Sequence, residues 1–143
     1  MTQAAHLVRR FAGSLSARRP DDTLAAQSLD PAELALWRRF GAADQRHSLV
    51  VAQRLLAAHP DAPRHEVAAA LLHDIGKLDA QLGTFRRVAA TVLVTGDRDR
   101  RYRDHERLGA ALLRSVGSDE RTVAIVAGEP SPERHRIDAA DDV

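Results

Sequence analysis

Apolar residues recur at helical spacing along almost the whole chain. The first such set contains Leu7, Val8, Phe11 and Leu15, and arginines occupy the other faces of the same segment. Pro20 then interrupts the pattern, because proline is disfavoured inside a helix. We therefore expect a first amphipathic helix before this proline.

Start and stop signals delimit the helices that follow. Asp30 is a suitable N-cap, and Pro31 follows it at the first helical position. The helix that they begin is expected to end at Gly41. The same reasoning predicts helices over residues 44–59, 65–76, 105–117, 119–128 and 132–143. Residues 83–94 suit either helix or strand, and we predict a helix because no neighbouring segment can pair with them.

Two segments complete the predicted architecture. Residues 95–104 alternate acidic and basic side chains, which predicts a solvated loop with Asp104 as the N-cap of the next helix. Residues 65–76 form the most apolar predicted helix, which we expect at the centre of the fold with Gly76 ending it. The predicted fold class is all-α, a compact helix bundle.

Composition narrows the possible functions. At 143 residues the chain has the size of one domain, and the absence of cysteine excludes disulfides and thiolate metal sites. With 21 basic and 20 acidic residues and 3% aromatics, we expect no stable nucleic-acid complex. Arginines interrupt the first apolar residues, and no apolar run reaches the ~18 residues of a membrane span. We therefore expect a cytoplasmic protein without a transmembrane segment.

The stretch LLHDIGK places His73 and Asp74 side by side near the end of the central predicted helix. A carboxylate at this position meets the negative end of the helix dipole and is disfavoured unless a cation compensates for it. A bound metal supplies such a charge, and so does Lys77 alone, so a metal site and a simple ion pair are the two alternatives. His47 lies beside apolar positions, where a core histidine is the alternative to a metal ligand.

In combination these residues resemble a known pattern. His47, the pair His73-Asp74 and Asp141 are similar to the H…HD…D pattern of the HD-domain superfamily of metal-dependent phosphohydrolases. The words HDIGK and HERLGAALL resemble further segments of that superfamily. The last motif of the superfamily's pattern resembles AADD at residues 139–142 of this chain. This resemblance favours Asp141 as the ligand over the alternatives Asp142 and Asp138.

The resemblance covers residues 31–143, which we interpret as an HD domain, and leaves residues 1–30 as an N-terminal helical extension. It implies that His47, His73, Asp74 and Asp141 bind a divalent metal ion. A donor set of nitrogen and oxygen suits Mn²⁺ or Fe²⁺, with Co²⁺, Ni²⁺ and Mg²⁺ as further candidates.

The same resemblance implies hydrolysis of a small phosphorylated substrate, a nucleotide or a related phosphate ester, by a metal-activated water. On this interpretation Asp74, Lys77 and His105 are catalytic residues. Lys77 also binds a substrate phosphate oxygen, and Arg46 is a second candidate for substrate binding.

One departure from the family pattern limits the metal content that we expect. Members with two metals usually carry a further histidine on a later helix, where this chain has Gly128-Glu129 followed by Pro130. We therefore expect one tightly bound ion, with any second ion held weakly through Asp74 and His105. The alternative function is that of a non-catalytic HD-fold module for regulation or protein interaction. The chain could form a homo-oligomer with either function.

Overall fold

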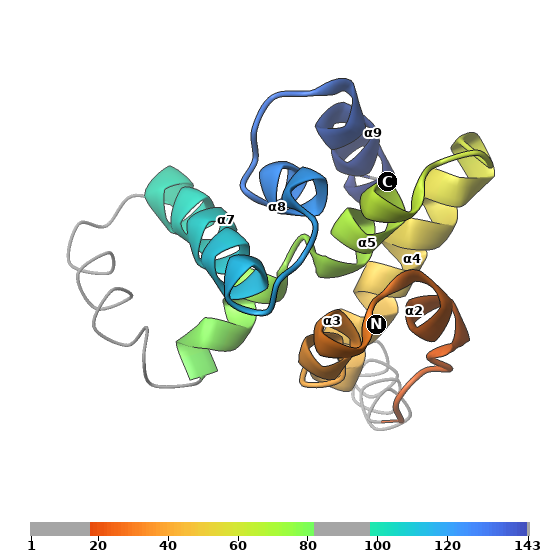
Figure 1. Ribbon diagram of the computed structural model, residues 1–143, viewed down its shortest axis with the longest axis horizontal. Coiled ribbons are helices and arrows are strands. Elements are labelled where there is room, and N and C mark those ends of the chain that lie inside the picture. The colour runs from red at the N-terminus through yellow and green to blue at the C-terminus, as the bar shows by residue number, and fades with distance from the viewer. Residues whose placement is uncertain (1–17, 82–97, 143) are drawn as a thin grey trace, which may run out of the picture.

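The computed structural model describes residues 18–81 and 98–142, in which the regular elements are all helices (Figure 1). The elements are α2 (Thr23–Ser28), α3 (Pro31–Trp37), α4 (Ala42–Ala58), α5 (Arg64–Leu72), the 3₁₀ helix η1 (Ile75–Gln81), α7 (Arg98–Ser115), α8 (Glu120–Val126) and α9 (Pro132–Asp141). The prediction of an all-α helix bundle is confirmed. The helices predicted before Pro20 and over residues 83–94 fall mostly or wholly outside the described residues.

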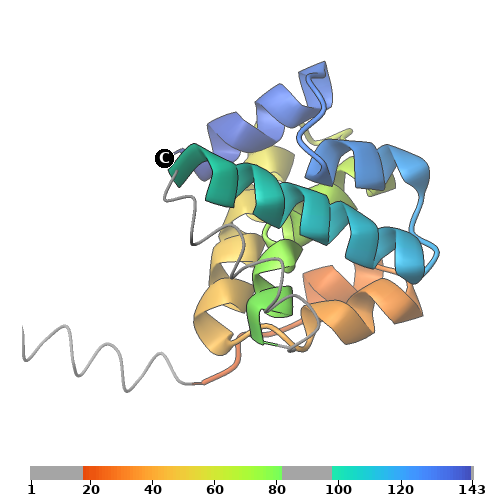
Figure 2. The same cartoon turned by 90° about the vertical axis from the view of Figure 1, so that its left-hand side faces the viewer.

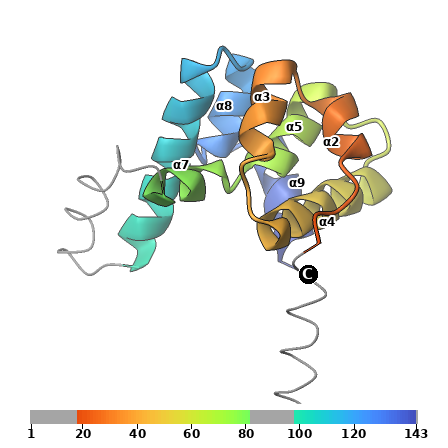
Figure 3. The same ribbon diagram turned by 90° about the horizontal axis from the view of Figure 1, so that it is seen from below.

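Helix α5 forms the centre of the bundle. Residues 66–72 are all buried, and α5 packs against α2, α4 and α8. Its alanines let the neighbouring helices approach closely, and its leucines fill the space between them. Figure 3 shows α4 alongside both α5 and α9. The prediction that this segment lies at the centre is confirmed.

Local signals at the start of α3 act as the sequence predicts. The Glu33 amide donates to Asp30 Oδ1 over 2.8 Å, and the Asp30 amide donates to Glu33 Oε1 over 2.9 Å. This reciprocal capping box stabilises the first turn, with Pro31 at the first helical position. The helix ends at Trp37, earlier than the expected end at Gly41.

The predicted loop over residues 95–104 is wrong where the structure describes it. Helix α7 begins at Arg98, so Asp104 lies inside the helix and is not its N-cap. Arginine is a good helix former, and aspartates four residues from arginines favour the helical state over a loop. The short helix α2 was also not predicted.

The expectation that Gly76 ends α5 is wrong as well. Helix α5 ends at Leu72, and Gly76 lies inside η1 without a positive φ angle. Its backbone instead packs directly on α7, because a Cβ atom at this position would overlap the carbonyl oxygen of His105. Gly109 of α7 makes the contact reciprocal, since its Cβ would lie 3.2 Å from the Gly76 nitrogen. Figure 2 shows α7 lying across η1 and α8.

Helix α9 is tied to its neighbours by partly buried ion pairs. Arg134 places Nη2 3.1 Å from Glu106 Oε1 of α7, and its Nη1 donates to the Ile125 carbonyl of α8 over 2.9 Å. Arg136 places Nε 2.6 Å from Oε1 of Glu66 on α5, whose side chain is only 1% exposed. These contacts fix the first half of α9 against three other helices.

No helix in the described parts of the chain has the length and apolar character to cross a membrane.

The packing of Gly76 predicts a specific cost of substitution. Gly76→Ser should lower the free energy of unfolding by about 1–3 kcal/mol, because the added atoms force η1 away from α7. Denaturant unfolding measures this value. Gly41→Ser is the matched control, since a Cβ there meets nothing within 4 Å and serine is a good N-cap for α4. Equal stability of the two variants would contradict the close contact.

Candidate metal centre

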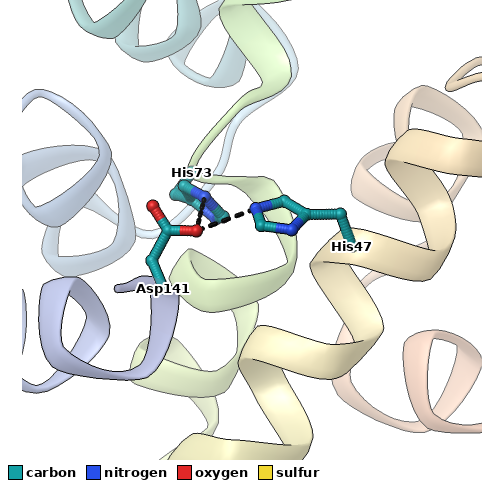
Figure 4. Close-up of side chains that lie close together, drawn as sticks. All are labelled: His47, His73 and Asp141. Carbon is teal, nitrogen blue, oxygen red and sulfur yellow. Dashed lines mark ion pairs between the residues drawn. The ribbon is translucent and has the colours of Figure 1, made fainter. Parts of the chain in front are cut away.

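Three helices bring His47, His73 and Asp141 together (Figure 4). His47 comes from α4, His73 is the C-cap of α5, and Asp141 is the last residue of α9. Asp141 Oδ1 lies 2.8 Å from His47 Nε2 and 3.8 Å from His73 Nε2. One potential ligand atom from each residue lies within 4.8 Å of the other two. Residues far apart in the sequence thus present a compact set of two nitrogens and one carboxylate oxygen.

The imidazole of His73 is held in one orientation. Its Nδ1 lies 2.8 Å from the Ala70 carbonyl oxygen, one turn back along α5. Because a carbonyl oxygen only accepts hydrogen bonds, Nδ1 carries a proton, and in the neutral imidazole Nε2 then presents its lone pair. This backbone contact had no signal in the sequence, since any residue at position 70 offers a carbonyl.

The Nε2 atom of His73 is the polar group that a metal ion would satisfy. The side chain is 3% exposed, and Nε2 has no hydrogen-bond partner among the described residues. A buried polar atom without a partner is costly, and such atoms are rare. An imidazole whose other nitrogen donates to a carbonyl, with a free Nε2 facing a histidine and a carboxylate, has the arrangement of a metal-binding histidine. The residues present therefore fit a divalent ion.

Asp74 lies beside this cluster, in the turn after α5. Its Oδ2 is 3.6 Å from His73 Nε2 and 4.0 Å from His47 Nε2. Burial raises the pKa of Asp74, but the charge that His73 carries when protonated, the hydrogen bond and charge of Lys77 and the charge that His47 carries when protonated outweigh it, so the pKa falls below its usual value. Asp74 is thus held as a carboxylate at the edge of the histidine pair.

Lys77 pairs with this carboxylate. Its Nζ lies 2.9 Å from Asp74 Oδ2, and the side chain is about half exposed. Burial lowers the pKa of Lys77, but the hydrogen bond to Asp74 and the charges of Asp74, Asp44 and Asp141 raise it above the usual value. The ion pair that the sequence left as an alternative to a metal is therefore present. It does not account for the unpartnered Nε2 of His73, which a metal ion would bind.

The other predicted site residues lie outside the cluster. Arg46 Nη1 donates to the Arg18 carbonyl over 2.7 Å, which places the guanidinium at the chain before α2. His105 is partly buried on α7 and is not among the clustered ligands, although its backbone carbonyl contacts Gly76. The roles assigned to Arg46 and His105 stay predictions.

The acidic neighbours of Asp141 have different surroundings. Asp138 Oδ1 lies 2.9 Å from Arg134 Nε, and Asp142 is the exposed C-cap of α9. Of the three, Asp141 is the residue that meets both histidines. Glu129 is exposed beyond the end of α8, apart from the cluster.

A cavity of about 470 Å³ adjoins the cluster at Asp141. It extends along α9 to Ser131 and to the turn at Gly128, which precedes this helix. The charged residues that line it in the described part of the chain are Glu106, Arg134, Asp138, Asp141 and Asp142. Carboxylates thus outnumber the guanidinium in its walls, and Arg134 is already paired with both Glu106 and Asp138.

Comparison with known proteins identifies the family. A model of the HD domain matches residues 45–141 of the chain, a range that begins just before His47 and ends at Asp141. No match was found among curated proteins or among solved structures.

The cluster predicts a metal-dependent gain in stability. Mn²⁺ at about 100 times its dissociation constant should stabilise the folded protein by about 2.7 kcal/mol, because the ligands meet only in the folded state. Asp141→Asn should lose most of this gain, whereas the neighbouring Asp142→Asn should keep it. Thermal unfolding with and without Mn²⁺ compares the three proteins. A gain of equal size in both variants would exclude Asp141 as a ligand.

Proposed function

Because the chain belongs to the HD domain family, we propose that it is a metal-dependent phosphohydrolase acting on a nucleotide or a related small phosphate ester. The single observation that supports a metal most directly is the buried Nε2 of His73, which has no hydrogen-bond partner and faces Asp141. Such an atom suits a metal ligand better than a structural histidine, whose two nitrogens are normally satisfied.

The proposed ligands are His47, His73, Asp74 and Asp141. Their nitrogen and oxygen donors suit Mn²⁺ or Fe²⁺, with Co²⁺, Ni²⁺ and Mg²⁺ as alternatives. A bound divalent ion supplies Lewis acidity, which polarises a phosphoryl oxygen and activates water for attack on phosphorus. The described donor set is compact enough for one ion, which agrees with the expectation of a single tight site.

Lys77 is the proposed phosphate-binding residue. Its ammonium group stays protonated because Asp74 accepts its hydrogen bond, and about half of the side chain remains accessible. An ammonium carries three donors, so the contact with Asp74 leaves others for a phosphate oxygen. The phosphoryl group is then placed between a fixed positive charge and the metal ligands. In contrast, Arg46 would first have to release the Arg18 carbonyl, and His105 would have to act from outside the ligand cluster.

The cavity beside Asp141 suits the organic part of the substrate. Among the described residues, its walls carry Glu106, Asp138, Asp141 and Asp142 against the guanidinium of Arg134. A second or third phosphate in this cavity would meet like charges, which is unfavourable. Sugar hydroxyls, which donate hydrogen bonds to carboxylates, would be favoured there. We therefore favour a phosphate monoester over a polyphosphate as the substrate.

The proposal predicts phosphate release that requires a divalent ion. With Mn²⁺, nucleoside monophosphates should be hydrolysed faster than the corresponding triphosphates, and chelation should abolish both activities. Asp74→Asn should lower kcat/KM by about 100-fold or more, because the carboxylate charge at the ligand cluster is lost. Phosphate release from a panel of esters measures these values. If the wild type binds Mn²⁺ but hydrolyses no ester of the panel, the non-catalytic HD-fold module becomes the better account.

A separate prediction concerns Lys77. Lys77→Met should raise KM by about tenfold while changing kcat less, because the ammonium binds phosphate in the ground state as well as in the transition state. Lys77→Arg, which keeps the charge, should restore part of the affinity. A large loss of kcat in Lys77→Met at unchanged KM would show instead that Lys77 acts only in the transition state.

A further inference from the structure

The position of Asp141 at the end of α9 raises a mechanical problem. The last carbonyls of an α-helix have no partners within the helix, so helix ends fray unless other groups bind them. The ion pairs of Arg134 and Arg136 hold the first half of α9, and Asp141 lies at its other end. A metal ligand at this end needs a contact that fixes the final turn.

Arg54 provides such a contact. Its Nη1 donates a hydrogen bond over 3.2 Å to the carbonyl oxygen of Ala140, the residue directly before Asp141. This carbonyl is one of those that the helix itself leaves unpaired. A guanidinium at a helix C-terminus also interacts favourably with the helix dipole. The bond is partly buried, which shields it from competing water.

The place of Arg54 on α4 relates this contact to the metal cluster. Arg54 follows His47 by seven residues on the same helix, which is about two turns and brings both side chains to one face. Helix α4 therefore contacts two successive residues at the end of α9, Ala140 and Asp141. His47 Nε2 meets Asp141 Oδ1 at 2.8 Å, and Arg54 binds the carbonyl of Ala140.

We propose that Arg54 is a positioning residue for the metal ligand Asp141, a role that rests on the proposed metal site. It fixes the final turn of α9 on α4, so that the carboxylate of Asp141 stays within reach of His47 and His73 before a metal binds. Without this bond, metal binding must also order the end of the helix, which lowers the affinity.

The test is the Mn²⁺ affinity of the full chain, measured by titration calorimetry. Arg54→Met keeps the aliphatic stem and removes the donors, and its Kd for Mn²⁺ should rise by about tenfold. Arg54→Lys keeps a charged donor group, and its Kd for Mn²⁺ should lie between those of Arg54→Met and the wild type. Arg38→Met is the matched control, because Arg38 is an exposed arginine paired with Asp22 away from the cluster, and its Kd should not change.

The outcomes separate this role from the metal site itself. Wild-type Kd values in both Arg54 variants would overturn the positioning role and leave the metal site intact. Failure of the wild type to bind Mn²⁺ would overturn both. Melting curves without metal show whether each variant is folded, and if Arg54→Met is not, the Kd of Arg54→Lys decides. A wild-type Kd for Arg54→Lys would then overturn the role, and a raised Kd would support it.

Discussion

The proposed site depends on α9 being held against α4 and α5, because Asp141 meets His47 and His73 only where these three helices converge. Hydrophobic packing alone fixes such a position poorly, since helices can slide along each other's apolar faces. Ion pairs are directional, and the partly buried pair between Arg136 and Glu66 connects α9 to the central helix at one defined register. The loss of Arg136 would leave the buried carboxylate of Glu66 without this partner, which is costly, so this register is strongly specified.

A second constraint acts on the segment that carries Asp74 and Lys77. Asp74 lies in the turn that joins α5 to η1, Lys77 lies in η1, and η1 packs on α7 through the direct backbone contact of Gly76. The glycine in HDIGK therefore serves the site indirectly, because it lets α7 support the segment that places Asp74 beside His73. The HDIGK motif thus contains two potential ligands, His73 and Asp74, together with their charged neighbour Lys77 and the packing position Gly76.

Sequence patterns predicted the features that depend on local chemistry or on residue types. The N-cap at Asp30 and the helix start at Pro31 follow from neighbouring residues, and the apolar run of α5 identifies the central helix. The family pattern brought His47, His73 and Asp141 together as candidates before any geometry was known. The role of Gly76 escaped prediction because the same glycine is also a common helix terminator, and only tertiary packing distinguishes the two. Backbone contacts such as that between His73 and Ala70 leave no trace in residue types.

The most direct test of the metal centre is anomalous diffraction at the manganese absorption edge, from crystals grown with Mn²⁺. The account predicts one strong peak for an ion that is bound by Nε2 of His73, Nε2 of His47 and carboxylate oxygens of Asp141 and Asp74. Nδ1 of His73 should still donate to the Ala70 carbonyl in that crystal. No peak between the two histidines, with Nε2 of His73 hydrogen-bonded to an ordered water instead, would contradict the metal centre and the function built on it.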